Sequence, residues 1–254
     1  MHALDLPVSV LLALWAPLPS SFGWRVVEGP DGAHDVVDGG DGRAGSPSHE
    51  SAPAGAVPLS RWLEAARPLY RCAAVLPCPA DPLPGLALAL EVGEAVLLEG
   101  GPGSAIEGRS VLLVPGGSGT SVTWRAHPLA CRPGSFDATQ SRRDVHAATD
   151  EAIETLVSLD LARERPELAE VLTDLVTAVA DPRLLPPSLD GRRRDLLERS
   201  LRLAAICELA LEDDGAAATA RAAGRRHEVL RRLLVTARRG VSAATQTWGP
   251  CART

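Results

Sequence analysis

The chain has 254 residues, of which 45% are hydrophobic and 3% aromatic, and its formal net charge is −6. All 26 basic residues are arginines, which excludes a lysine-dependent phosphate loop, a Schiff-base lysine nucleophile and an ordinary protein kinase. The hydrophobic fraction is sufficient for a packed core, and the length favours two domains.

The chain begins with a predicted core helix. Asp5 is a suitable N-cap, Pro7 suits a first helical turn, and the apolar run that follows ends at Pro17. An acidic residue precedes this run, whereas a secretory signal has basic residues there. The run is also shorter than the roughly 20 residues that span a membrane, so we expect no membrane association.

Five cysteines, an odd number, are spread along the chain without a C-x-x-C motif: Cys72, Cys78, Cys131, Cys207 and Cys251. This usage favours reduced thiols that are buried as small apolar side chains, with a Cys72–Cys78 disulfide as the alternative. We therefore expect a cytoplasmic protein.

Residues 1–137 are predicted to form an α+β domain with a small, mostly antiparallel sheet. Strands are expected over residues 22–27, 35–37, 70–76, 86–92, 95–99, 110–114 and 121–127, and short helices over residues 7–16 and 58–66. The turn residues 28–32 would join the first two strands as a hairpin. Residues 38–57 are rich in Gly, Ser, Pro and charge, so we expect a flexible loop there.

Residues 138–254 change to long amphipathic patterns, which predict an all-α antiparallel helical bundle of four helices. The helices are expected over residues 139–164, from Pro166, from the N-cap Asp190 to about residue 211, and from Asp213 or Asp214 onward. Apolar side chains such as Val145 and Ala148 mark the inward faces. We expect the tail after Thr245 to be frayed, with docking of Trp248 as the alternative.

Basic residues concentrate near the end of the chain, where residues 215–245 hold seven arginines and one acid, Glu228. We define the arginine face as Arg221, Arg225, Arg231, Arg232, Arg238 and Arg239, which lie on or beside one stripe at helical spacing. A planar guanidinium fork suits phosphate and carboxylate groups. A second cluster, Arg192, Arg193 and Arg194, lies at the start of a predicted helix, where the helix dipole favours acids. These nine arginines are the candidate partner-binding residues.

Pairing within the chain is the alternative for the arginine face, because charge runs are commonly solvated or paired. The first two predicted bundle helices carry acids that an antiparallel arrangement could bring within reach: Asp150, Glu151, Glu154, Asp160, Glu167, Glu170 and Asp174.

No local motif indicates a catalytic residue, a cofactor or a metal. The glycine-rich residues 116–120 lack lysine, lead into a strand and miss the G-x-S-x-G pattern, so they indicate a hairpin turn. The acids within residues 31–41 lack the spacing of an EF-hand. His146, Asp150 and Glu154 share a helical face, but the chain contains no Glu-x-x-His motif of a bundle metal site.

Three segments resemble uncharacterised proteins of GC-rich actinobacteria: residues 6–15, residues 122–128 and the Ala- and Arg-rich final helix. The resemblance spans most of the chain. It implies that lineage and a cytoplasmic location, and it carries no known activity.

Three functional hypotheses follow. The first is a non-catalytic protein-interaction or adaptor protein that holds a macromolecular partner, or a second copy of itself, on the arginine face. The second is a nucleic-acid-associated regulatory protein that uses the same face, although a pI near 5.6 is unlike a general nucleic-acid binder. The third is an enzyme or small-ligand binder with a site between the two domains.

Overall fold

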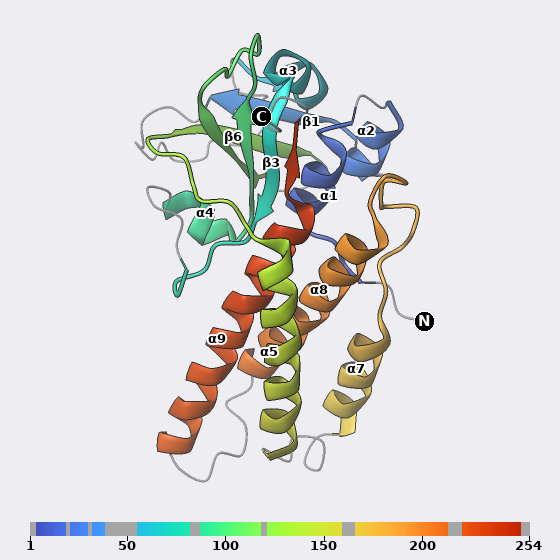
Figure 1. Cartoon of the computed structure of the whole chain (residues 1–254), viewed down its shortest axis with the longest axis vertical. Coiled ribbons are helices and arrows are strands. Elements are labelled where there is room, and N and C mark those ends of the chain that lie inside the picture. The colour runs from blue at the N-terminus through green and yellow to red at the C-terminus, as the bar shows by residue number, and fades with distance from the viewer. Residues whose placement is uncertain are drawn as a thin grey trace. The chain divides into compact units, whose positions relative to one another are not determined.

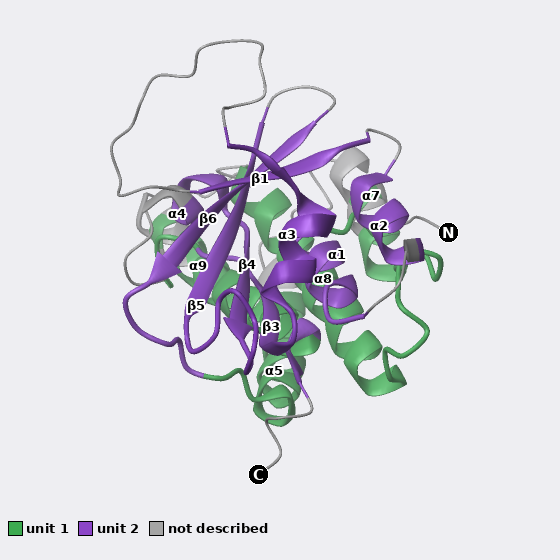
Figure 2. Cartoon of the chain, turned by 90° about the horizontal axis from the view of Figure 1, so that it is seen from above, with its two compact units in different colours: residues 1–6, 78–81, 135–244 green, residues 7–77, 82–134, 245–254 purple. Residues whose placement is uncertain are grey.

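The computed structural model describes residues 4–18, 21–29, 32–38, 55–81, 87–117, 121–158, 166–212 and 220–249. The chain divides into two compact units (Figure 2). The sheet unit comprises residues 7–77, 82–134 and 245–254, and the helical unit comprises residues 1–6, 78–81 and 135–244. Within the predicted loop 38–57, residues 39–54 lie outside the described part.

A seven-stranded sheet dominates the sheet unit. Its strands are β1 (His34–Asp38), β2 (Val57–Pro58), β3 (Leu69–Val75), β4 (Ala95–Gly100), β5 (Ser110–Gly116), β6 (Val122–Leu129) and β7 (Thr247–Trp248). They are arranged in the order β2-β1-β6-β5-β4-β3-β7, and every pair is antiparallel except β1–β6, which is parallel. The structure thus confirms a mixed α and β chain with a mostly antiparallel sheet.

The centre of the sheet follows from two apolar runs. All residues of β4 are buried, as are Ser110–Pro115 of β5. Their pairing sets Leu97 opposite Leu112 and Leu98 opposite Val111. Because both faces of these strands are covered, Ala95–Leu98 and Val111–Pro115 are continuously apolar, and the polar residues Glu99 and Ser110 at their ends are also buried. Helix α1 (Val8–Trp15) packs on β3 and β4, and its burial confirms the predicted core helix.

One predicted strand of this unit is wrong because residues 21–28 form helix α2 (Ser21–Glu28). Its buried residues Gly23 and Val27 are four apart, as a helix requires. A Cβ on Gly23 would lie 2.8 Å from Trp15 Cε3, so the glycine permits close packing of α2 on α1. Residues 35–37, which were predicted to pair with this strand in a hairpin, do form a strand, β1, but it pairs with β2 and β6.

A second predicted strand, residues 86–92, is also wrong, since the structure has helix α4 (Ala87–Val92) there. Apart from Val92, the apparent alternation consists of Leu, Ala and Glu, which are among the strongest helix formers. Gly93, at φ 82°, ends the helix, and its N–H donates to Ala89 O at 2.9 Å. The predicted short helix near residue 60 is confirmed as α3 (Leu59–Ala66).

A buried arginine organises one edge of the sheet unit. Arg71 on β3 is 1% exposed, and its Nη1 donates to Glu99 Oε1 of β4 at 3.1 Å. Its guanidinium also donates hydrogen bonds to Pro133 O at 2.8 Å, Gly134 O at 2.6 Å and Gln246 Oε1 at 2.8 Å. Arg71 therefore links β3 and β4 to Pro133 and Gly134, which precede the long helices, and to Gln246, which follows them.

The C-terminal segment completes this sheet where the sequence predicted a frayed tail. Thr247 and Trp248 form β7 and pair with Cys72 and Arg71 of β3, so the docking alternative describes this segment (Figure 1). Gly249 N donates to Tyr70 O, which extends the pairing. This pairing covers main-chain groups at the edge of β3. Residues 250–254 of the predicted tail lie outside the described part of the structure.

The helical unit contains α5 (Ala138–Ser158), α7 (Pro166–Thr177), α8 (Gly191–Glu212) and most of α9 (Ala220–Thr245). Helix α8 packs against both α5 and α7, so the predicted helical bundle is confirmed in part. Asp190 caps α8 as predicted, because its Oδ1 accepts from the N–H groups of Arg192 and Arg193 at 3.0 Å.

Three of these helices meet at one glycine. A Cβ on Gly240 of α9 would lie 2.3 Å from Ser200 Oγ of α8 and 2.7 Å from Val145 Cγ2 of α5. Such distances allow hydrogen and nothing larger at this position. The apolar stripes predicted for α5 and α9 are confirmed where they are described, for example by the burial of Val145, Ala148 and Val241. The stripe predicted for α7 is partly wrong, because Val171, which was expected to face inward, is 44% exposed.

Candidate functional site

The predicted arginine face lies on α9, the last helix of the chain. Of its six residues, Arg231, Arg232, Arg238 and Arg239 have described side chains. The side chains of Arg221 and Arg225 lie outside the described part of the structure. The helix itself is held by the apolar residues between the arginines, since Leu230, Leu233 and Ala237 are buried.

Two of these arginines pair with acids on neighbouring helices. Arg232 Nη2 pairs with Glu151 Oε1 of α5. Arg238 Nη2 pairs with Glu208 Oε1 of α8 at 2.9 Å. Glu151 is one of the acids that the sequence proposed for pairing within the chain, whereas Glu208 is not. Glu208 lies 30 residues from Arg238 along the chain, and only the packing of the helices brings the two side chains together.

A third arginine is held at two points. Arg239 Nε lies 2.7 Å from Asp81 Oδ2, and its Nη2 lies 2.9 Å from Asp81 Oδ1. The hydrogen bond with Asp81 is the main reason that the pKa of Arg239 is raised above its ordinary value. Asp81 comes from the short segment Cys78–Asp81, which belongs to the helical unit although the rest of that region belongs to the sheet.

Two of these three ion pairs are accessible to solvent, whereas the side chain of Arg238 is only 19% exposed. The side chains of Arg232 and Arg239 are 64% and 60% exposed, and those of Glu151 and Asp81 are 42% and 37% exposed. Exposed pairs contribute about 0 to 1 kcal/mol each, so the carboxylates can be exchanged. Arg231 is exposed and makes no ion pair with a described residue.

The second predicted cluster has a different character. Arg193 Nε donates to Ala244 O in the last turn of α9 at 2.8 Å, a favourable place for a cation. Arg194 pairs with Glu198 one turn along α8 at 3.0 Å. Arg192 is exposed, and its main-chain oxygen accepts from Arg142 Nη2 at 3.3 Å. Two of the three arginines therefore have local partners.

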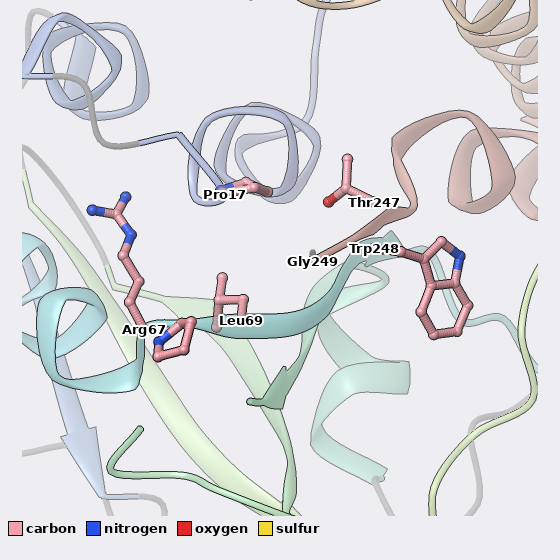
Figure 3. A pocket seen from close by; sticks show the side chains of 7 residues that line it. Pro17, Arg67, Leu69, Thr247, Trp248 and Gly249 are labelled. Atoms are coloured by element: carbon pink, nitrogen blue, oxygen red, sulfur yellow. The ribbon is translucent and has the colours of Figure 1, made fainter. Parts of the chain in front are cut away.

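A pocket that sequence analysis missed lies within the sheet unit (Figure 3). Its volume is about 490 Å³, and its lining comes from three distant segments: Pro17, Arg67, Pro68, Leu69, Thr247, Trp248 and Gly249. No motif could have revealed it, because the pairing of β7 with β3 brings these segments together.

The described residues include no cluster of three or more His, Cys, Asp and Glu side chains suited to a metal ion. His146 and Asp150 lie 3.9 Å apart on α5, and both are exposed. Cys72, Cys78 and Cys207 are free and buried, and Cys131 is free and exposed. Burial raises the pKa of Cys207 to about 12, so this thiol stays protonated at neutral pH.

In the part of the chain that the structure describes, every helix is too short or too polar to cross a membrane.

Part of the chain matches a known protein-family model. Residues 139–242 match the family model of the "Rv1486c-like protein, C-terminal domain", and these residues lie within the 135–244 segment of the helical unit. No curated protein and no solved structure matches the chain. The family description names no activity or ligand, and it fits the resemblance to uncharacterised actinobacterial proteins. Over these residues the chain is thus similar to the Rv1486c-like C-terminal domain.

Proposed function

We propose that this protein is a non-catalytic interaction protein and that the arginine face of α9 binds an acidic segment of a partner protein. The observation that carries the proposal is the exposure of the paired arginines. Arg232 and Arg239 keep 64% and 60% of their side-chain surface in solvent although each has a carboxylate partner.

The intrachain pairs are compatible with this role, because Arg232 and Arg239 each already have a carboxylate partner. Arg239 grips Asp81 in the two-point geometry that arginine uses for carboxylate recognition. A partner carboxylate would replace an exposed pair by another of similar strength, while Arg231 supplies a cation without an ion pair among the described residues. The proposed binding is therefore an exchange of ion pairs, and salt should weaken it.

A capture experiment from native lysate tests this proposal. The tagged wild-type chain and the variant R231A/R232A/R239A are compared at low and high salt, with and without nuclease. We expect a protein partner that survives nuclease treatment and is lost with the variant. The control variant R125A/R183A/R199A removes the same charge from exposed positions outside the arginine face and should retain the partner.

Unchanged capture by R231A/R232A/R239A would contradict the proposal. Co-purified nucleic acid that is lost steeply as the salt concentration rises would support the alternative function, a nucleic-acid-associated regulatory protein that uses the same face. Capture of the chain's own second copy would identify self-association.

The free thiols of the four described cysteines support the further proposal that the protein works in a reducing cytoplasm.

A further inference from the structure

Strand β7 forms one edge of the seven-stranded sheet, and among the described residues its partner strand is β3. Gly249 N donates to Tyr70 O at 2.9 Å, so these two residues belong to a hydrogen-bonded pair of the antiparallel ladder. The adjacent pair, Trp248 opposite Arg71, is therefore a non-hydrogen-bonded pair, in which the main-chain groups point away from the partner strand. The N–H and C=O of Trp248 thus point to the open edge, and neither forms a hydrogen bond with a described residue.

The Trp248 side chain covers one face of this edge. Because directly opposed residues share a face of the sheet, the ring lies on the side of Arg71, whose guanidinium is 5.3 Å from the ring centre. Tyr70 meets the ring edge to face at 5.6 Å, and Figure 3 shows the ring pointing away from Pro17 and Thr247. Trp248 is held by these contacts while it stays 44% exposed. Such a preformed apolar surface lowers the entropic cost of binding.

Arg132 adds a positive charge beside this aromatic surface. Its guanidinium lies 5.6 Å from the centre of the Tyr70 ring, and its Nε lies 3.4 Å from Glu99 Oε2. The other carboxylate oxygen of Glu99 accepts from the buried Arg71, so one carboxylate serves two arginines and a positive charge is left in excess. Arg132 is the accessible member of this group, with 53% of its side chain exposed. The surface therefore favours an acidic group on a ligand.

The opposite face of β7 borders the pocket. Thr247 lies on that face together with Cys72, whose Sγ donates to Ala13 O of α1 at 3.5 Å. Thr247, Leu69 and Pro17, which follows α1, all line the pocket, and its volume is about 490 Å³. This face of the edge therefore offers a largely apolar cavity in which an apolar side chain can be buried.

We propose that an extended segment of a partner protein adds to β7 as an antiparallel strand. One residue of that segment exchanges both main-chain hydrogen bonds with Trp248, and its side chain lies on the face of the Trp248 ring and Arg132. The two flanking residues point to the face of the pocket, because successive side chains of a strand alternate. The excess charge and the pocket specify the sequence: an acidic residue opposite Trp248, flanked by apolar residues. Main-chain pairing at a sheet edge with pockets for alternate side chains is an established mode of peptide recognition.

The peptide acetyl-Ala-Leu-Glu-Leu-Ala-amide is the probe for strand addition. Its binding to the full chain is followed by the NMR shift of the Trp248 main-chain N–H, which the variant W248F identifies. Methylation of the Glu nitrogen removes the donor to Trp248 O and should weaken binding about fivefold or more. Methylation of the next Leu nitrogen is the matched control, since that N–H points away from β7, and it should retain the affinity of the parent peptide.

Replacement of Glu by Gln in the probe tests the role of Arg132. We expect the Glu peptide to bind about two- to fivefold more tightly, because an exposed ion pair is weak. R132Q should abolish this preference, whereas R132K, which keeps the charge, and R125Q, at an exposed position of β6, should retain it. R231A/R232A/R239A should bind the probe as the wild type does, because the arginine face belongs to the helical unit and β7 to the sheet unit.

Equal affinity of the parent peptide and the peptide methylated at the Glu nitrogen would overturn strand addition. An unchanged preference for Glu in R132Q, or its loss in a folded R132K, would overturn the role of Arg132. A Trp248 N–H that does not shift with the Glu peptide at millimolar concentration would overturn the site itself. Oligo-uridylate is the comparison ligand: a shift with it and none with the peptide would contradict the proposal and assign the exposed ring to base stacking.

Discussion

Arg239 and Asp81, which are 158 residues apart in the sequence, form a two-point ion pair with distances of 2.7 and 2.9 Å. Both side chains are substantially exposed, so the pair should contribute about 1 kcal/mol or less to the free energy of unfolding. We predict that D81N folds with nearly wild-type stability in urea denaturation. The conservative variant D81E should bind Arg239 similarly, and a loss of several kcal/mol in D81N would show that the pair is structural.

Gly240 should be intolerant of a side chain, because a Cβ there would lie within 2.7 Å of Val145 Cγ2 as well as against Ser200. We predict that G240A destabilises the helical unit by about 1 to 3 kcal/mol through overpacking. Gly224 on the same helix is the matched control, since a Cβ at that position would have no described atom within 4 Å. G224A should stabilise the chain by about 0.5 to 1 kcal/mol, and stabilisation by both substitutions would refute the close packing at Gly240.

Glu99 should be essential to the sheet unit, because it is the carboxylate partner of the buried Arg71. We predict that E99Q lowers the free energy of unfolding by about 3 kcal/mol, since it leaves a buried cation without its counter-charge. R132Q is the control: Arg132 is 53% exposed and lies 3.4 Å from the other oxygen of Glu99, so its loss should cost less. Chemical denaturation measures the free energy of unfolding of both variants. Equal losses in E99Q and R132Q would contradict the larger loss predicted for E99Q.

Asp137 should make the stability of α5 dependent on pH. Its Oδ1 accepts from the N–H groups of Gln140 and Thr139, and these hydrogen bonds lower the pKa of the carboxyl group. A lowered pKa means that the stabilisation is complete above the ordinary aspartate pKa of about 3.9 and is lost as the pH falls through the folded-state value.

Thermal unfolding of wild type, D137N and D137A tests this cap. D137N keeps an acceptor oxygen but loses the charge, so the acid-induced loss of stability at Asp137 should disappear. D137A should have a lower melting temperature than D137N at neutral pH, because the two N–H groups lose their acceptor. Identical acid profiles for wild type and D137N would exclude the proposed linkage.

The sequence predicted the fold well where a single type of signal, such as an apolar run or an N-cap residue, determined the element. The continuous apolar runs of β4 and β5 and the N-cap Asp190 of α8 lie where the patterns indicated. Residues 86–92 failed because alternating Leu and Ala satisfy a strand by period and a helix by propensity, and the propensity prevailed. Residues 22–27 failed because the packing of Gly23 beneath Trp15 is a tertiary contact.

The candidate sites show the same division. The helical spacing of Arg232 and Arg239 could be predicted from the sequence, but only one of their two partners could. Glu151 was among the acids proposed for pairing, and Asp81 was not. Long-range pairing also decides the pocket, since Arg67 and Trp248 meet one cavity because the chain returns to β3 after α9. Such contacts depend on topology, which no local pattern specifies.

The most direct test of the proposed arginine face is the affinity of a labelled oligo-glutamate peptide for wild type, D81N/E151Q and R231A/R232A/R239A at low salt. If carboxylate exchange is the mechanism, D81N/E151Q releases two arginines and should bind more tightly, by up to roughly fivefold for each released pair. R231A/R232A/R239A should bind at least about tenfold more weakly than wild type. Equal affinity of all three proteins would contradict the account.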